Sequence, residues 1–313
     1  MYKIGIDFGG TNIAIGLVDA NGKIKAKLSV PTPAKEGMDA VVATMDKTCR
    51  ALVAQEGLTL DDVSFIGVAS PGAINGTTGC IEYYSGMDVR NYPLAANLSK
   101  ATGVKDIRCE NDANAAALAE AKYGAAAGSA HSITVTLGTG VGGGIIVDGK
   151  VYAGFNHSAA EIGHMVIVAD GILCSCARKG CFESYSSATA LIRDTKFAMD
   201  NNPTSAMHDI AKEAGKVSGK TAFLAAKKGD KAAQDVVDQY IKLLACGLAN
   251  LINLFQPEVL CISGGISGEG DNLLVPLTKL VMEEQYAKTT PNKTKLLIAA
   301  LGNDAGIVGA ASL

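Results

Sequence analysis

The first part of the chain alternates short apolar runs with polar, glycine-containing turns, the pattern of β-strands joined by tight turns. A β-branched strand enters a Gly/Thr loop, a second strand follows, and an Asp-Gly type of turn leads into a third. The outline recurs 129 residues later, where residues 4–7 match 133–136 and residues 18–19 match 147–148. We expect a duplicated β-hairpin unit, the alternative being two unrelated hairpins of similar pattern.

Downstream segments alternate between helical and strand patterns. The pattern predicts, after the first copy, a helix near 38–56, strands at 64–69 and 106–109, and an alanine-rich helix at 113–122 capped by Gly124; after the second copy, helical stretches near 186–214 and 230–255 and strands at 259–262 and 296–300. Such alternation is typical of layered α/β lobes. We expect one lobe from residues 1–115 and a larger one from 116–302, with a helix near 303–313 that could complete the first.

Length and composition agree with a packed protein of two lobes. The 313 residues are 48% hydrophobic and 19% charged, and 36 glycines suit an architecture with many tight turns. The net charge of −3 gives no broad positive field, so we expect neither nucleic acid nor a membrane surface as a partner. No apolar run reaches the length of a membrane span, and no secretion signal is recognisable. These features predict a cytoplasmic protein.

Three glycine-rich loops follow predicted strands and suit phosphate groups. They comprise Asp7, Gly9, Gly10, Thr11 and Asn12; Gly138, Thr139 and Gly140; and Gly264 and Gly265. Glycine lets backbone N–H groups approach an anion without a Cβ in the way, and the threonines add hydroxyl donors. One such loop alone is usually an ordinary turn, but three at strand ends favour an oligophosphate. Neither the Walker nor the dinucleotide spacing is present.

Two aspartates stand at predicted strand ends. Asp7 suits a water-mediated contact to Mg²⁺, the alternative being a turn-capping aspartate. Asn111 and Asp112 both suit the N-cap of the alanine-rich helix, which is a sufficient structural reason for them. A carboxylate at a helix start can also accept the proton of a sugar hydroxyl while a phosphoryl group arrives. We favour Asp112 as this base and Asn111 as a sugar ligand.

Four metal-binding side chains cluster in the second half of the chain. His164, Cys174, Cys176 and Cys181 form the pattern H-x9-C-x-C-x4-C. One imidazole and three thiolates are a tetrahedral zinc set, and a closed shell of four ligands indicates a structural site. We expect zinc to order the segment 164–183. The other five cysteines lie in apolar contexts typical of buried thiols, which argues against a disulfide framework.

Two glutamates, Glu161 and Glu183, flank the metal ligands in the sequence. Their positions place two carboxylates against the segment that the metal orders. Each could accept hydrogen bonds from sugar hydroxyls, and each could equally be an ordinary solvated glutamate.

The motifs together resemble the repressor, open reading frame and kinase (ROK) family of sugar kinases and sugar-responsive regulators. The resemblance covers essentially the whole chain and is most specific at residues 7–11, 111–115, 137–143, 161–164 and 174–183. It implies an actin-like, ribonuclease H-like fold of two duplicated lobes. It also implies a homodimer that uses ATP and Mg²⁺ to phosphorylate a hexose, commonly on the hydroxyl of carbon six.

The resemblance assigns roles to individual residues. Asp112 would be the base, and the sugar would be held by Gly72, Asn111, Glu161, His164 and Glu183. One ring nitrogen of His164 would bind zinc while the other meets a sugar hydroxyl. Glucose is the expected sugar, followed by mannose, allose, fructose and N-acetylmannosamine.

Three short segments depart from the family's pattern. Gly86 and Val89 stand where many glucose-phosphorylating members carry an Asn and a Trp. This departure removes a familiar sugar contact and weakens the case for glucose. Ala177 and Ala160 each replace a common glycine, and both changes leave the metal ligands and carboxylates in place.

Two other classes of protein compete with a kinase. A sugar-sensing regulator of the same family usually carries an N-terminal helix-turn-helix, whereas here the first predicted strand begins at residue 3. An ATPase switch module needs no sugar pocket, and the constellation of Glu161, His164 and Glu183 argues against it. Hexose-dependent production of ADP would distinguish these classes.

Overall fold

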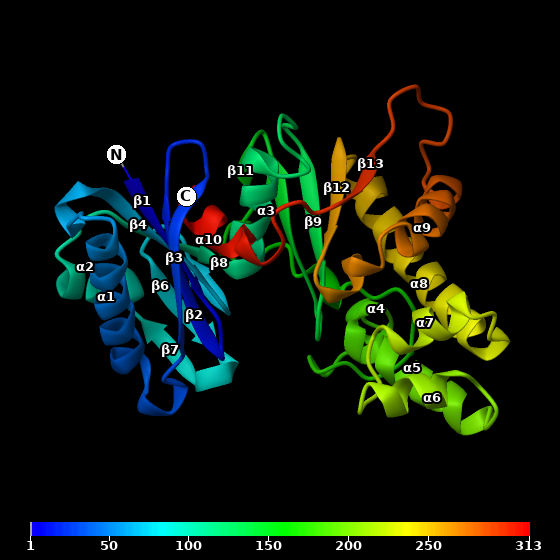
Figure 1. The fold of residues 1–313 in the computed structure, drawn as a ribbon. Coiled ribbons are helices and arrows are strands. Elements are labelled where there is room, and N and C mark those ends of the chain that lie inside the picture. The colour runs from blue at the N-terminus through cyan, green and yellow to red at the C-terminus, as the bar shows by residue number, and fades with distance from the viewer. Residues whose placement is uncertain (1) are drawn as a thin grey trace. The chain divides into compact units, whose positions relative to one another are not determined.

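The computed structural model describes residues 2–313 and shows an α/β protein (Figure 1). Its strands are β1 (Tyr2–Phe8), β2 (Asn12–Val18), β3 (Ile24–Pro31), β4 (Val63–Ser70), β5 (Ala73–Asn75), β6 (Cys80–Tyr84), β7 (Val89–Tyr92), β8 (Ile107–Asn111), β9 (Ser132–Leu137), β10 (Val141–Val147), β11 (Lys150–Val151), β12 (Val259–Ser263) and β13 (Lys295–Ile298). Its helices are α1 (Met38–Gln55), α2 (Leu94–Thr102), α3 (Asp112–Tyr123), α4 (Glu183–Ser186), α5 (Ala188–Asn201), α6 (Met207–Glu213), α7 (Thr221–Lys227), α8 (Lys231–Phe255), α9 (Asp271–Glu284) and α10 (Ala305–Ala310).

The chain divides into two compact units. The first contains the residues up to 134 together with 144–160 and 300–313, and the second contains residues 135–143 and 161–299. Both segments of the chain that return to the first unit come from beyond the alanine-rich helix α3.

The two five-stranded sheets repeat one order of strands. The first has the order β3-β2-β1-β4-β8 and the second the order β11-β10-β9-β12-β13. In the first sheet β1, β2 and β3 pair antiparallel, whereas β4 pairs parallel with both β1 and β8. In the second sheet β10 and β11 pair antiparallel and β12 and β13 parallel. The shared order confirms the duplicated unit that the sequence repeat predicts.

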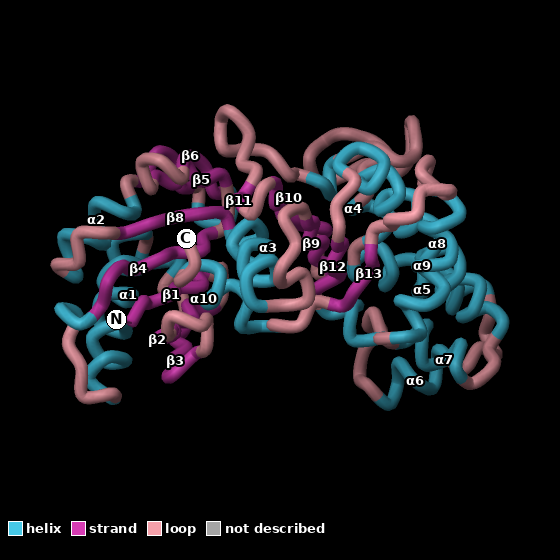
Figure 2. Tube along the Cα trace, turned by 90° about the horizontal axis from the view of Figure 1, so that it is seen from above, coloured by secondary structure: helices cyan, strands magenta, loops and turns pink. Residues whose placement is uncertain are grey.

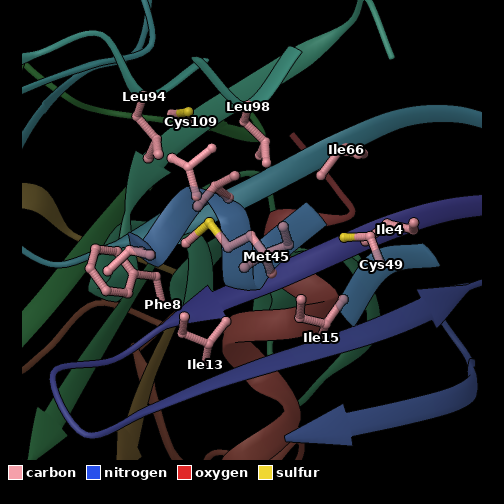
Figure 3. Packing of buried hydrophobic residues seen from close by; sticks show 14 of the residues in the cluster. Ile4, Phe8, Ile13, Ile15, Met45, Cys49, Ile66, Leu94, Leu98 and Cys109 are labelled. Atoms are coloured by element: carbon pink, nitrogen blue, oxygen red, sulfur yellow. The ribbon is translucent and has the colours of Figure 1, made fainter. Parts of the chain in front are cut away.

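One face of the first sheet packs against α1 and α2 (Figure 3). Alternate residues of a strand point to the same face, and in β1 these are Ile4, Ile6 and Phe8, all fully buried. Met45 and Cys49 of α1 meet them in the same cluster. Burying a side chain of this size contributes about 1.5–3 kcal/mol, so this cluster fixes the register of β1.

The other face of the first sheet lies directly against α10. Gly5 of β1 faces the backbone of Ile307, and Gly67 of β4 faces the backbone of Ala310. A Cβ at either glycine would overlap the helix. The absence of side chains at these two positions therefore lets α10 approach the sheet, and it brings Gly306 next to Asp7 at the end of β1.

Glu120 of α3 fastens the segment that leads into α10. Its side chain is 1% exposed, and its carboxylate accepts hydrogen bonds from the backbone N–H groups of Ala125, Ala300 and Leu301 at 2.8, 3.0 and 2.8 Å. We expect Glu120→Ala to leave buried donors unpaired and to lower the free energy of unfolding by about 3–5 kcal/mol. Urea denaturation measures the loss. Glu120→Gln, which keeps one acceptor oxygen, should lose about half as much, and equal stability of both variants and the parent would contradict this role.

The second unit is mainly helical outside its strands, with α5, α7 and α9 packed on the long helix α8 (Figure 2). The helical stretch expected near 186–214 is not continuous. It forms α5 and α6, and the break between them contains Pro203, which has no N–H to donate. Asp230 caps α8 by accepting a hydrogen bond from the N–H of Ala233 at 3.0 Å. Among residues 2–313, no helix combines the length and the apolar character that crossing a membrane requires.

The cysteines outside the metal-binding pattern differ in burial. Cys49, Cys109 and Cys261 are buried as expected. Cys80 and Cys246 are only partly buried, so the prediction of a buried thiol is wrong for these two. Cys80 is the first residue of β6, and Cys246 lies in the second half of α8, between the exposed and the buried sides of that helix.

Candidate functional site

Asp7 and Asp112 lie together at one edge of the first sheet. β1 and β8 both pair parallel with β4, so their carboxyl ends meet at the same edge, and Asp112 directly follows β8 as the first residue of α3. Burial and the nearby charge of Asp112, in that order, raise the pKa of Asp7 to about 6. Asp7 also faces Gly306, where a Cβ would stand 2.5 Å from its carboxyl carbon. The structure thus brings together two of the carboxylates that the sequence singles out.

Asn111, not Asp112, is the N-cap of α3. Its side-chain oxygen accepts hydrogen bonds from the N–H groups of Ala113 and Asn114 at 3.0 and 3.2 Å. Its amide nitrogen donates to the carbonyl of Gly72 at 3.1 Å, so these two predicted sugar ligands are in contact. Because Asn111 caps the helix, the capping role does not account for Asp112.

Glu110 supports this junction and has no assigned role in the sequence analysis. Its Oε1 accepts hydrogen bonds from the N–H of Asn111 at 2.8 Å and from the side-chain amide of Asn114 at 3.0 Å. The signal in the sequence is the spacing of four residues between Glu110 and Asn114 across the strand-helix junction. Glu110 therefore fixes the backbone that presents Asn111 and Asp112.

The first glycine loop, between β1 and β2, is a closed turn with an exposed tip. The N–H of Gly9 donates to the carbonyl of Asn12 at 2.9 Å, and the hydroxyl of Thr32 donates to the carbonyl of Gly9 at 2.7 Å. Gly10, Thr11 and Asn12 are exposed. The tip is therefore held from below while its own residues face solvent, an arrangement that suits an anion.

The other two glycine loops lie side by side in the second unit. Gly264 has a φ of +87°, and a Cβ there would overlap the backbone of Leu137, just ahead of Gly138. Thr139 is exposed, and Gly140 is half-buried beside Glu183. A cavity of about 430 Å³ adjoins the second loop and is lined by Thr139, Gly140, Cys174, Ser175, Glu183 and Arg193, among others.

The four predicted metal ligands converge. One ligand atom from each of His164, Cys174, Cys176 and Cys181 lies within 4.8 Å of all the others. His164 Nδ1 is 3.7 Å from Cys174 Sγ, and Cys176 Sγ is 3.6 Å from Cys181 Sγ. Sulfur ligands around a tetrahedral zinc ion, with Zn–S bonds of about 2.3 Å, stand about 3.8 Å apart. The set therefore fits zinc, with Nδ1 as the ligand atom of the histidine.

The thiols of this cluster differ in their ease of ionisation. Burial raises the pKa of Cys181, and the neighbouring cysteines raise it further. Burial also acts to raise the pKa of Cys174, but hydrogen bonds, first among them the one from the N–H of Cys176, outweigh it and lower that pKa. Cys174 thus ionises more readily than Cys181.

The two candidate glutamates have different surroundings. Glu161 is exposed at the start of the short turn that carries His164. Glu183 is half-buried at the start of α4, with Oε2 accepting from the N–H of Val141 at 3.1 Å and Oε1 from the hydroxyl of Ser175 at 3.2 Å. The sequence contains no local signal for these contacts, because Val141 lies 42 residues away.

Comparison with known proteins decides the family. The sequence model of the ROK family matches residues 3–313. The chain belongs to the ROK family. The glucokinase of Thermotoga maritima is 36% identical over 312 residues, which cover 99% of this chain and 96% of that enzyme. The glucokinase of Streptomyces coelicolor is 36% identical over 315 residues, which cover 99% of this chain and 96% of that enzyme.

A solved structure of a relative agrees with the fold. The crystal structure of a ROK family glucokinase from Streptomyces griseus, in complex with glucose and AMPPNP, matches with a TM-score of 0.81 at 36% identity and covers 99% of this chain and 98% of that one. Family membership and the actin-like fold, both predicted from the motifs, are confirmed.

Two departures from the ROK pattern have a structural consequence. Val89 is 7% exposed and belongs to the core of the first unit. Gly86 lies against the ring of Tyr84, so that a larger side chain would displace the ring. Neither position can therefore offer a side chain to a ligand without rearrangement.

The other two departures stand at positions where the backbone favours glycine. Ala160 has a φ of +66° and Ala177 a φ of +67°, the left-handed region in which a Cβ is unfavourable. The left-handed conformation of these two alanines lowers the free energy of unfolding by about 1 kcal/mol at each position. Ala160 directly precedes Glu161, and Ala177 directly follows Cys176, so both sit beside site residues.

Proposed function

We propose that this chain is an ATP-dependent hexose kinase that transfers the γ-phosphoryl group of ATP to the 6-hydroxyl of glucose. The observation that carries the proposal is 36% identity to glucokinases over 99% of the chain. The relative solved with glucose and AMPPNP supports the same pair of substrates. The local geometry agrees, because an aspartate and a ligand asparagine open α3 and two glycine loops adjoin each other in the second unit.

In the proposed reaction Asp112 is the general base. Its carboxylate takes the proton of the 6-hydroxyl as that oxygen forms a bond to the γ-phosphorus, and the bond between the γ-phosphorus and the bridging oxygen of ADP breaks. The transition state of phosphoryl transfer is loose, so orientation of the hydroxyl matters more than strong basicity. Asn111 and Gly72, which contact each other, would orient the sugar beside Asp112.

Mg²⁺ would neutralise charge on the phosphate groups. Asp7 suits this ion through a bridging water, because it lies beside the exposed tip formed by Gly10 and Thr11. The main-chain amides of the glycine loops would hold the phosphate oxygens.

We also propose that His164, Cys174, Cys176 and Cys181 hold one structural zinc ion. Nδ1 of His164 would bind the metal, which leaves Nε2 for a sugar hydroxyl and fixes the tautomer. Cys176→Ser should reduce the zinc content to well below one per chain and lower the melting temperature by roughly 5 °C or more. Elemental analysis and a thermal melt measure both. Cys246→Ser, outside the cluster, should contain as much zinc as the parent. A parent protein that contains less than one zinc ion per chain after purification under reducing conditions would contradict the site.

A coupled assay of ADP formation over a panel of hexoses tests the proposed function. We expect turnover with glucose to exceed that with mannose, allose, fructose and N-acetylmannosamine. A different preferred hexose would keep the kinase activity but correct the sugar, in line with the lack of a ligand-facing side chain at Gly86 and Val89. Binding of hexose without any production of ADP would instead indicate a sugar-sensing regulator.

We further propose that the enzyme is a homodimer in the cytoplasm, in keeping with the family resemblance. Light scattering coupled to size exclusion separates a 32.1 kDa chain from a dimer of twice that mass.

A further inference from the structure

The second glycine loop is held by one short segment of the chain. This segment, residues 183–189, begins two positions after the last metal ligand and contains α4 and the start of α5. Three hydrogen bonds join it to the loop: the N–H of Val141 donates to Glu183 Oε2 at 3.1 Å, the N–H of Ala188 donates to the carbonyl of Gly138 at 2.8 Å, and the hydroxyl of Thr189 donates to the carbonyl of Thr139 at 2.7 Å. The loop therefore depends on residues 183–189 for its conformation.

Glu183 also contacts the segment 174–181, which carries the three predicted cysteine ligands. Its second oxygen, Oε1, accepts from the hydroxyl of Ser175 at 3.2 Å. One carboxylate thus joins the cysteine segment on one side to the glycine loop on the other. It is half-buried, so solvent screens these bonds less than on an open surface.

Gly140 fits this arrangement. Its φ is not positive, so backbone conformation gives no reason for glycine at this position. A Cβ there would overlap Glu183 Oε2, the oxygen that receives the N–H of Val141. The absence of a side chain at 140 therefore lets the carboxylate reach the loop.

We propose that Glu183 is a positioning residue for the nucleotide, coupling the metal-bound segment to the loop that holds the ATP phosphates. Main-chain amides bind an anion well only when they are already oriented, and the bond to Val141 orients this loop before the nucleotide arrives. A sugar that shifts the carboxylate of Glu183 would change the affinity for nucleotide, and the nucleotide would by reciprocity change the affinity for that sugar by the same factor. The proposal rests on the proposed function for the identity of the loop's ligand.

The test measures the affinity of AMPPNP with Mg²⁺ for the zinc-loaded protein in the absence of sugar, by calorimetry. We expect Glu183→Ala to weaken this affinity by about tenfold, the scale of one lost charge-assisted hydrogen bond. Glu161→Ala is the matched control, since Glu161 is also a predicted sugar ligand but is exposed. It should weaken glucose binding while AMPPNP binding stays within about twofold of the parent.

Glu183→Gln provides the rescue. The amide keeps an oxygen that can accept from Val141, so we expect most of the nucleotide affinity to return. Zinc content and circular dichroism of every variant show whether a loss comes from a disrupted fold. Unchanged AMPPNP affinity in Glu183→Ala, an equal loss in Glu161→Ala, or no recovery in Glu183→Gln would overturn the proposal. A parent protein that binds AMPPNP but phosphorylates no hexose would defeat the proposed function and leave this inference standing.

Discussion

Asp112→Asn should lower kcat by at least about a hundredfold while the affinity for glucose stays close to that of the parent. Asparagine has the same size as aspartate. It also keeps a side-chain oxygen that can accept the hydrogen bond from the N–H of Ala113, which Asp112 Oδ1 accepts at 2.8 Å in the parent. The helix cap is unaffected, because Asn111 provides it. The substitution therefore removes the proton acceptor with little other change, and steady-state kinetics with equilibrium binding of glucose separate the two effects.

Asp271→Asn is the matched control for this experiment. Asp271 is likewise the first residue of a helix, α9, and is exposed in the second unit. The same chemical change there removes a favourable charge at a helix start, worth about 0.3–1 kcal/mol, and should leave kcat unaltered. Turnover of Asp112→Asn near that of Asp271→Asn would exclude Asp112 as the base.

The antiparallel hairpins that open both sheets could be predicted because the information is local. The two copies of the hairpin pattern each carry their own alternation and turn residues, and Asp148 and Gly149 both take the positive φ that a tight hairpin turn requires. The convergence of His164, Cys174, Cys176 and Cys181 could equally be predicted, since these side chains lie within 18 residues in a recognisable spacing. Short-range patterns thus account for the parts of the structure that the sequence analysis describes well.

The conformation of a single junction and the contacts between segments far apart in the sequence could not be predicted. Whether Asn111 or Asp112 caps α3 depends on φ and ψ at a single junction, and both residues are good caps. The bond between Glu183 and Val141, and the approach of Gly306 to Asp7, depend on how separate elements pack. No periodicity or composition encodes such a distance, so the sequence predicts Glu183 only as a sugar ligand or a solvated residue.

Asp7→Asn should stabilise the Mg²⁺-free protein at pH 8 and impair it as an enzyme. Burial first, and then the charge of Asp112, raise the pKa of Asp7 to about 6 in the folded protein, against an ordinary value of 3.8. Between these two values the folded chain holds a proton that the unfolded chain has released, so stability falls as the pH rises from about 4 to about 6. Above that range the ionised Asp7 costs the fold roughly 2–3 kcal/mol.

An asparagine escapes this cost because it does not ionise. The gain in unfolding free energy of Asp7→Asn should be largest at pH 7–8 and shrink toward zero near pH 4, measured by urea denaturation in Mg²⁺-free buffer. Asp61→Asn, at an exposed aspartate in the same unit, should give no such pH-dependent gain. The KM for MgATP should rise at least about tenfold in Asp7→Asn, because the carboxylate that destabilises the Mg²⁺-free protein is the one proposed to contact Mg²⁺ through a water. If the variant is less stable than the parent at pH 8, the ionised carboxylate of Asp7 stabilises the fold. Its charge would then not be a destabilising feature retained for binding Mg²⁺.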